Sequence, residues 1–288
     1  MKMWRYLKAT ILYRFAVVAT VITVSVVATA CVAEAKVITK KAISLKIDGT
    51  NHQLDLYSEL GSEMERRPGL LLVPEYWGKD KLLIQPAEVL AGKGYIVLVL
   101  DIYGEGRSTT EVAMADKFVE VAEAKGVERV IDLVDRAVTL FKAQAGVDPA
   151  RLGAVGFGYG GGLVYNLAKG GASGLKVAVS FYGGTKKIRE TSRVGRLPEL
   201  LYLRPAHDVY TSDEEFAVFK AEIAKSGIPY EIFPVNEAYY GFIHKDIEMY
   251  GSDEGNTFMH FDSKAAALAW DKTYRFLEEK LKLKTAIK

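Results

Sequence analysis

Two hydrophobic patterns alternate along most of the chain. Gly69–Val73 and Tyr95–Leu100 are short, continuous apolar runs, which are typical of parallel strands covered on both faces. Residues 127–145 instead place apolar side chains at three- and four-residue steps, which predicts a helix. By the same criteria we expect further strands at 152–157, 177–181, 200–203 and 230–233, and further helices at 81–93, 113–124, 163–169, 213–226 and 263–281. This alternation predicts an α/β fold with a doubly wound, mostly parallel sheet.

The segment before the first apolar run has a different pattern. Val37–Ile47 and His52–Leu60 are rich in β-forming residues, and Asp48-Gly49-Thr50-Asn51 between them is typical of a turn, so we expect a β-hairpin. No linker, internal repeat or low-complexity run follows residue 36. Residues 36–288 are therefore expected to form a single domain that opens with this hairpin.

Residues 1–35 have the layout of a secretory signal peptide. Basic side chains without any acid precede the uncharged run Phe15–Ala30. Because the uncharged stretch approaches the roughly 20 apolar residues that a membrane span needs, an uncleaved anchor is the alternative.

Two small-residue sites compete for cleavage of this leader. Ala28-Thr29-Ala30 before Cys31 resembles a bacterial lipobox, which would make Cys31 a lipidated first residue; the alternative is a chance cysteine in an apolar leader. The second site is Ala33-Glu34-Ala35 before Lys36. We expect an exported, periplasmic or cell-envelope protein that contacts a membrane only through its leader or a lipid.

Composition and charge argue against nucleic-acid binding and against sites built from several cysteines. The 38 basic and 36 acidic residues give a net charge of +2, which lacks the basic excess that binding to a nucleic-acid backbone requires. Cys31 is the only cysteine, so neither a disulfide framework nor a multi-cysteine metal site can form. The histidines show no paired metal-binding spacing. We therefore expect no nucleic acid, no metal and no cofactor.

A glycine-rich turn, Gly156-Phe157-Gly158-Tyr159-Gly160-Gly161, lies between a predicted strand and a predicted helix. It matches the G-x-G-x-x-G pattern of a dinucleotide cradle, but that pattern also needs a carboxylate at the end of the next strand. That strand ends in Ser180-Phe181-Tyr182-Gly183-Gly184, so dinucleotide binding is disfavoured. The competing interpretation is a nucleophile elbow, a strained turn that lifts one side chain above the sheet.

The chain after the leader resembles the dienelactone hydrolase family of α/β-hydrolases. The resemblance rests on the order and spacing of six motifs: Pro-Glu-Tyr-Trp-Gly at 74–78, Lys-Gly-Tyr at 93–95, Asp-Ile-Tyr-Gly at 101–104, Gly-Phe-Gly-Tyr-Gly-Gly at 156–161, Phe-Tyr-Gly at 181–183 and Ala-x-x-Ala-Trp at 266–270. It implies an α/β-hydrolase fold. It also implies the family's chemistry, the hydrolysis of small carboxylic esters or lactones by a Cys or Ser, an Asp and a His.

Two of the three catalytic positions implied by the resemblance are substituted. The nucleophile position is Gly158, and the His position falls on Tyr240, whereas the acid position retains Asp208. A catalytic triad needs a nucleophile, an adjacent base and a group that orients the base. The resemblance therefore predicts a degenerate triad and a non-catalytic protein, a pseudoenzyme.

The remaining parts of the implied site predict a ligand pocket. A backbone N–H of Tyr159 and one from the Tyr76–Trp77 loop can form an oxyanion hole, and Glu75 matches an acid that the family keeps beside its nucleophile. Tyr103 and Tyr182 add aromatic walls. Such a pocket suits a small carbonyl- or carboxylate-containing ligand; a protein partner is the alternative.

An active ester or lactone hydrolase with non-standard groups is the rival hypothesis. His244 would be its base if the loop after Tyr240 turned inward, although a surface position beside Lys245 and Asp246 is the favoured interpretation. For His207 we expect a solvent-facing role or a hydrogen-bonding role at the strand end, and for Ser180 a core position. For Tyr159 we expect a packing role.

Overall fold

The computed structural model describes residues 36–124, 126–170, 174–188, 190–191, 196–252 and 258–282. The predicted leader, including Cys31, lies outside these residues. The strands are β1 Ile38–Ile47, β2 Thr50–Glu59, β3 Arg67–Val73, β4 Ile96–Val99, β5 Val147–Phe157, β6 Val177–Phe181, β7 Glu199–His207 and β8 Tyr230–Tyr239. The helices are α2 Lys81–Gly92, α3 Val112–Glu123, α4 Glu128–Lys142, α5 Tyr159–Gly170, α6 Asp213–Ser226 and α7 Ser263–Leu281, with short 3-10 helices η1 Ser62–Met64 and η2 Ile247–Met249.

One sheet of eight strands, in the order β1-β2-β4-β3-β5-β6-β7-β8, organises these elements. β1 pairs antiparallel with β2 and β2 with β4, whereas every later neighbour is parallel. The predicted N-terminal hairpin is present, with a tighter turn than expected. Asp48 and Gly49 alone connect its strands, both with φ in the left-handed region, as a two-residue hairpin turn requires. The predicted α/β fold is confirmed.

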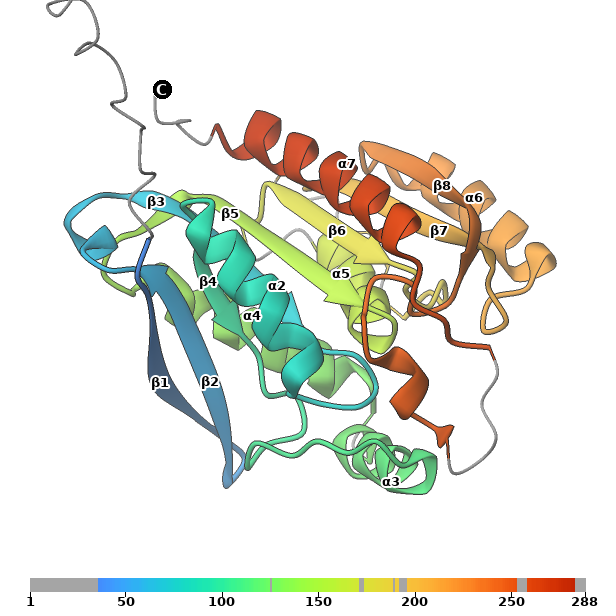
Figure 1. The fold of residues 1–288 in the computed structure, drawn as a ribbon, viewed down its shortest axis with the longest axis horizontal. Helices are drawn as coiled ribbons and strands as arrows, with labels where there is room; N and C mark the ends of the chain where they lie inside the picture. Colours follow the sequence, from blue (N-terminus) through green and yellow to red (C-terminus); the bar gives the residue numbers. More distant parts are fainter. Residues whose placement is uncertain are drawn as a thin grey trace, which may run out of the picture. The chain divides into compact units, whose positions relative to one another are not determined.

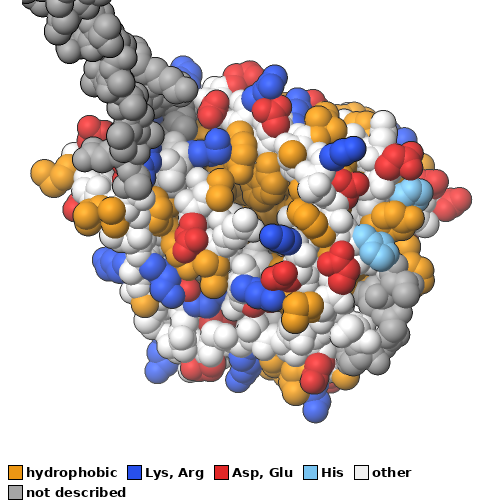
Figure 2. Space-filling view, in the orientation of Figure 1, with side chains coloured by type: hydrophobic (Ala, Val, Ile, Leu, Met, Phe, Trp, Pro, Cys, Tyr) orange, Lys and Arg blue, Asp and Glu red, His pale blue; other side chains and the backbone are white. Residues whose placement is uncertain are grey.

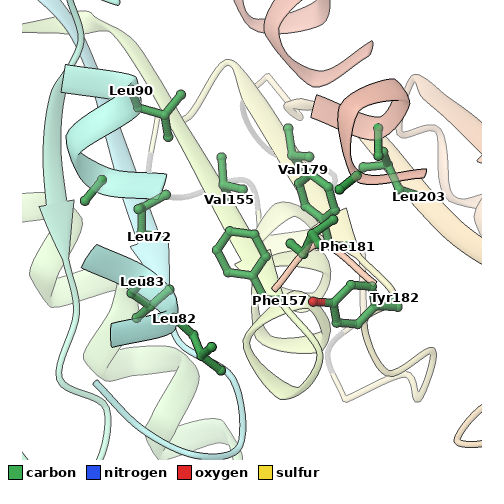
Figure 3. Close-up of a cluster of buried hydrophobic side chains, with 14 of the residues drawn as sticks. Leu72, Leu82, Leu83, Leu90, Val155, Phe157, Val179, Phe181, Tyr182 and Leu203 are labelled. Atoms are coloured by element: carbon green, nitrogen blue, oxygen red, sulfur yellow. The ribbon is translucent and has the colours of Figure 1, made fainter. Parts of the chain in front are cut away.

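Helices cover both faces of the sheet (Figure 1), with α2 and α7 on one face and α4 and α5 on the other. This layering explains the continuous apolar run of β3, because Leu70 and Leu72 face one layer while Leu71 and Val73 face the other. Figure 3 shows part of the first of these cores, with leucines of α2 on one side and the strand residues Val155 and Phe181 further along the sheet. No described helix is both long and apolar enough to cross a membrane.

The boundaries of several helices follow from local capping. The side chain of Asp80 accepts the Leu82 N–H at the start of α2, and Asp262 does the same for α7. Ser212 and Glu215 form a reciprocal capping box on α6, which ends at Gly227 in the left-handed conformation.

The parallel strands end at one edge of the sheet, where ligand sites of such folds form. The residues within two positions of these ends include Glu75 after β3, Gly158 after β5, Tyr182 after β6, Asp208 after β7 and Tyr240 after β8. α3 lies apart from the two helical layers, below the sheet in Figure 1. The fold thus gathers residues that are far apart in the sequence.

Candidate functional site

The turn from β5 to α5 is a tight elbow centred on Gly158. Its φ of 49° is left-handed, and its N–H donates to the carbonyl of Phe181 at 3.0 Å. A Cβ on Gly160 would collide with the carbonyl oxygens of Val73 and Pro74, so the backbone there admits only glycine. A Cβ on Gly158 would collide with the hydroxyl oxygen of Tyr240. The tyrosine hydroxyl therefore fills the space directly above the elbow.

Tyr240 presents its hydroxyl to this point from the end of β8. Its ring is 9% exposed and lies 4.6 Å from the ring of Tyr182 and 4.5 Å from that of Tyr210, centroid to centroid. Within the described part of the chain the hydroxyl has no hydrogen-bond partner. Burial, followed by the nearby carboxylate of Glu75, raises the pKa of Tyr240 well above its usual value of 10. Tyr240 is consequently a neutral hydrogen-bond donor.

Glu75 forms the acidic part of the site and is 3% exposed. Its Oε1 accepts a hydrogen bond of 2.8 Å from the hydroxyl of Tyr182. Its Oε2 has no hydrogen-bond partner and lies 3.1 Å from the point that a Cβ of Gly158 would occupy. Buried carboxylates are normally hydrogen-bonded or paired at both oxygens. An Oε2 without a partner beside Gly158 is therefore a candidate acceptor for a hydrogen bond from a ligand.

Tyr182 holds Glu75 from a strained backbone position. Its φ of 40° is left-handed, which is unusual for a residue with a side chain, and its N–H donates to the carbonyl of Leu203 at 2.8 Å. Such conformations persist only where the surroundings enforce them, and they concentrate at functional sites. The residue with this unusual backbone conformation is thus the one whose hydroxyl donates to Glu75.

His244 is buried, so the favoured surface position was wrong. It is 3% exposed, because the turn after Tyr240 folds back so that its N–H donates to the Gly241 carbonyl at 2.9 Å. The ring packs edge-on against Phe157, and Nε2 lies 3.3 Å from Oε1 of Glu75, although the two atoms are not aligned for a hydrogen bond. His244 therefore faces Glu75 inside the protein.

Asp208 follows β7, but it takes no direct part in this cluster. Its Oδ1 accepts the N–H groups of Tyr210 and Thr211 at 3.0 and 3.2 Å, and its Oδ2 is buried without a partner. Burial raises its pKa to about 6. No hydrogen bond or ion pair among the described residues joins Asp208 to His244 or Tyr240. It instead shapes the turn that carries Tyr210 and Thr211.

A cavity of about 450 Å³ opens above the elbow. Its lining consists of Glu75, Tyr76, Trp77, Val112, Asp116, Gly158, Tyr159, Tyr182, Gly184, Tyr210, Thr211, Tyr240 and Met259. This lining contains no Cys, Ser, His, Lys or Arg among the described residues. The cavity has the size of a small-molecule site and is mostly aromatic, with two acidic side chains.

Five of the six pocket residues expected from the sequence line this cavity, and Tyr103 does not. Its hydroxyl donates to the Tyr76 carbonyl at 2.9 Å, and its ring packs on Phe118 and Tyr159, behind the cavity wall. Sequence reasoning missed the lining residues Val112 and Asp116 of α3, Tyr210 and Thr211 after β7, and Met259. The hydroxyl of Tyr76 bonds to Asp116 and to the Val112 carbonyl, and thereby ties α3 to the cavity rim.

The other candidate side chains lie outside the cluster around Glu75. The Tyr159 hydroxyl donates to Glu123 at 2.6 Å, and Ser180 is fully buried, with no partner for its hydroxyl among the described residues. His207 is exposed and stacks on Tyr239. Tyr159 is the first residue of α5, so its backbone N–H has no acceptor within the helix and remains suited to an oxyanion hole.

In the described segments no three His, Cys, Asp or Glu residues are grouped as a metal would need.

A second cavity, of about 380 Å³, lies between α2 and α7. Figure 2 shows it as a hollow with hydrophobic side chains at its centre. Its walls include Pro86, Val89, Trp270 and Tyr274, and His244 also lines it. His244 thus borders this second cavity while facing Glu75, which lines the first.

The comparisons with known proteins agree with this geometry. A model of the dienelactone hydrolase family matches residues 54–281. The chain belongs to this family. No curated protein matches the sequence.

Solved structures share the fold. A dienelactone hydrolase-like promiscuous phosphotriesterase from metagenomic libraries superposes with a TM-score of 0.73 at 22% identity, over 84% of this chain and 98% of the other. An alpha/beta hydrolase from a Medee basin deep-sea metagenome gives 0.61 at 18% identity, covering 85% and 99%. Esterase 2 of Thermogutta terrifontis, phosphorylated by paraoxon, gives 0.61 at 18% identity, covering 86% and 96%. At these identities the likeness establishes the α/β-hydrolase fold.

Proposed function

We propose that this dienelactone hydrolase family member binds a small carbonyl compound in the cavity above Gly158 and does not hydrolyse it through a triad. The observation that carries this proposal is the Tyr240 hydroxyl, which occupies the space above the elbow where a nucleophile would project. Asp208 has no described contact with a histidine, so it orients no base. The triad is in this view degenerate, and the site is a binding pocket.

The charge of the cavity supports a neutral carbonyl group over a carboxylate. Glu75 and Asp116 line it, and no Lys or Arg does within the described residues. A carboxylate ligand would meet repulsion there without a compensating cation. A carbonyl oxygen, in contrast, would accept hydrogen bonds from the Tyr240 hydroxyl and the Tyr159 N–H, while the aromatic walls cover the rest of the ligand.

We also propose that the protein acts outside the cytoplasm, in the periplasm or cell envelope. This proposal rests on the basic and apolar pattern of residues 1–35 and on the lipobox-like sequence before Cys31.

The rival proposal is an ester or lactone hydrolase that uses His244. The buried contact between His244 and Glu75 is the observation that favours it. Against it, His244 does not line the cavity above Gly158, and the hydroxyls that do belong to tyrosines and Thr211.

The experiment combines ligand binding with two tests of hydrolysis on the full-length protein. We expect small aromatic ketones to bind, as measured by ligand-detected NMR, and Tyr240→Phe to weaken this binding. A Cys31→Ser background removes the only thiol, and in it neither a fluorophosphonate probe nor turnover of p-nitrophenyl acetate should exceed a heat-denatured control. Ester turnover well above this control that disappears in His244→Ala would refute the proposal and establish the rival.

A further inference from the structure

We propose that the same cavity moves a proton at the carbon next to the ligand's carbonyl group, with Glu75 as base and Tyr240 as hydrogen-bond donor to the carbonyl oxygen. The inference rests on the proposed carbonyl site and extends it from binding to keto–enol tautomerisation. Its substrates would be small neutral ketones or β-dicarbonyl compounds that carry acidic hydrogens on that carbon.

The two oxygens of Glu75 are placed differently, as a positioned base requires. Oε1 is fixed by the hydroxyl of Tyr182 at 2.8 Å and lies 3.3 Å from Nε2 of His244. Oε2 is buried without a hydrogen-bond partner and lies 3.1 Å from the point that a Cβ of Gly158 would occupy, next to the Tyr240 hydroxyl. One oxygen thus holds the carboxyl group in place, while the other has no partner and belongs to a side chain that lines the cavity.

A hydrogen-bond donor shares this space with the base. The Tyr240 hydroxyl lies against the same point above Gly158 and has no partner among the described residues. Burial keeps this phenol protonated at neutral pH, so it can donate to a developing enolate oxygen. A carboxylate base beside a neutral phenol in an apolar pocket is a known solution for removing protons next to carbonyl groups.

The reaction balances without any further reactant. Glu75 removes a proton from the carbon next to the carbonyl, and the C–H electron pair forms a carbon–carbon double bond. The π pair of the carbonyl moves onto its oxygen, which accepts hydrogen bonds from the Tyr240 hydroxyl and the Tyr159 N–H. Glu75, now protonated, returns the proton to the same carbon or to a conjugated one. No bond to the protein forms, so the reaction needs no nucleophile at position 158.

The test follows hydrogen–deuterium exchange of bound carbonyl compounds in D₂O by proton NMR. The probes are phenylacetone and acetylacetone, and binding is recorded in the same samples by saturation transfer. We expect the full-length protein to accelerate exchange of the hydrogens next to the carbonyl. Glu75→Gln should reduce the accelerated rate at least tenfold, and Tyr240→Phe by about 10- to 100-fold.

Matched controls lie outside the cavity. Glu63→Gln and Tyr230→Phe make the same chemical changes at exposed positions and should leave the exchange rate unchanged. Circular dichroism checks that each variant is folded. If the probes bind but exchange no faster than in buffer, or if Glu75→Gln exchanges as fast as the parent, the inference is wrong while the binding proposal stands. If neither probe binds, the binding proposal fails as well.

Discussion

At the scale of single residues, Gly158 and Tyr240 are coupled through the space between them. Gly158 has a left-handed φ, and the position of its missing Cβ is taken by the Tyr240 hydroxyl, with Cζ of the same ring 3.2 Å away. A side chain at position 158 would therefore meet both backbone strain and a collision. Gly158 and Tyr240 therefore form one packing unit.

This coupling predicts the stability of two variants. Gly158→Ala should lower the free energy of unfolding by about 2 kcal/mol or more, through the strained φ and the overlap with Tyr240. Adding Tyr240→Phe should restore part of the loss, because it removes the overlapping hydroxyl. Urea unfolding of the parent, both single variants and the double variant measures the coupling. Gly92→Ala, in α2 with open space around it, is the control and should be neutral or slightly stabilising.

Asp208 predicts a pH dependence of stability. Burial raises its pKa in the folded protein to about 6, from 3.8 for an unperturbed carboxyl group. The folded state therefore binds the proton more tightly, and the contribution of Asp208 to stability falls as the pH rises from about 4 to about 6. Asp208→Asn replaces the carboxyl group with an amide that does not ionise, so this pH-dependent loss of stability is absent from the variant. Its stability relative to the parent should increase by about 1–3 kcal/mol between pH 4 and pH 8, as measured by urea unfolding. A constant difference between the two proteins would contradict the shift.

At the scale of elements, the apolar pattern predicted the buried strands better than the edge strand. The 177–181 strand agrees with β6, because every residue of β6 is buried. β8 runs from Tyr230 to Tyr239 and not to 233 as expected, because its second half, at the sheet edge, is mostly exposed and buries only Val235 and Ala238. α5 begins at Tyr159, four residues earlier than expected, since packing against the sheet outweighs the low helix propensity of Gly160–Gly162.

The site was predictable where it consists of strand ends and not where it depends on loops. Glu75 and Tyr182 follow apolar runs, so their common edge could be inferred, whereas Tyr240 was placed there by the family resemblance. His244 lies among polar neighbours, and only the fold of its turn decides that it is buried while Lys245 is exposed. Val112 and Asp116, which also line the cavity, belong to α3. The sequence pattern predicts this helix but not where it lies relative to the sheet.

α3 offers a prediction at this scale. Only Ala115 of this helix is buried, so its docking depends in part on the hydroxyl of Tyr76, which bonds to Asp116 and the Val112 carbonyl. Tyr76→Phe should accelerate amide hydrogen exchange in Val112–Glu123 about fivefold, the effect of losing about 1 kcal/mol of local stability. Exchange in α4, whose apolar face is fully buried, should not change. Equal exchange in both proteins would show that other contacts hold α3.

At the scale of the whole molecule, the predicted leader and the folded domain carry different expected properties. The domain residues matched by the family carry the cavity, whereas the expected export depends only on residues 1–35. Location and ligand binding can therefore be tested independently.

The leader predicts one of two processed forms. In a bacterial host fed a clickable fatty acid, we expect either labelling that Cys31→Ser abolishes or an unlabelled protein whose N-terminus is Lys36. Cell fractionation and N-terminal sequencing distinguish these outcomes. Cytoplasmic protein that retains residues 1–30 would rule out export.

The unpartnered Oε2 of Glu75 also has a consequence for laboratory evolution of this protein. A buried carboxylate with one unsatisfied oxygen opposes folding, and exchanging such a group for an apolar side chain of similar volume is often neutral or stabilising. A population of variants selected for heat resistance alone would thus drift towards Met or Leu at position 75. A population that must also retain the ligand would keep the acid and accept a lower melting temperature.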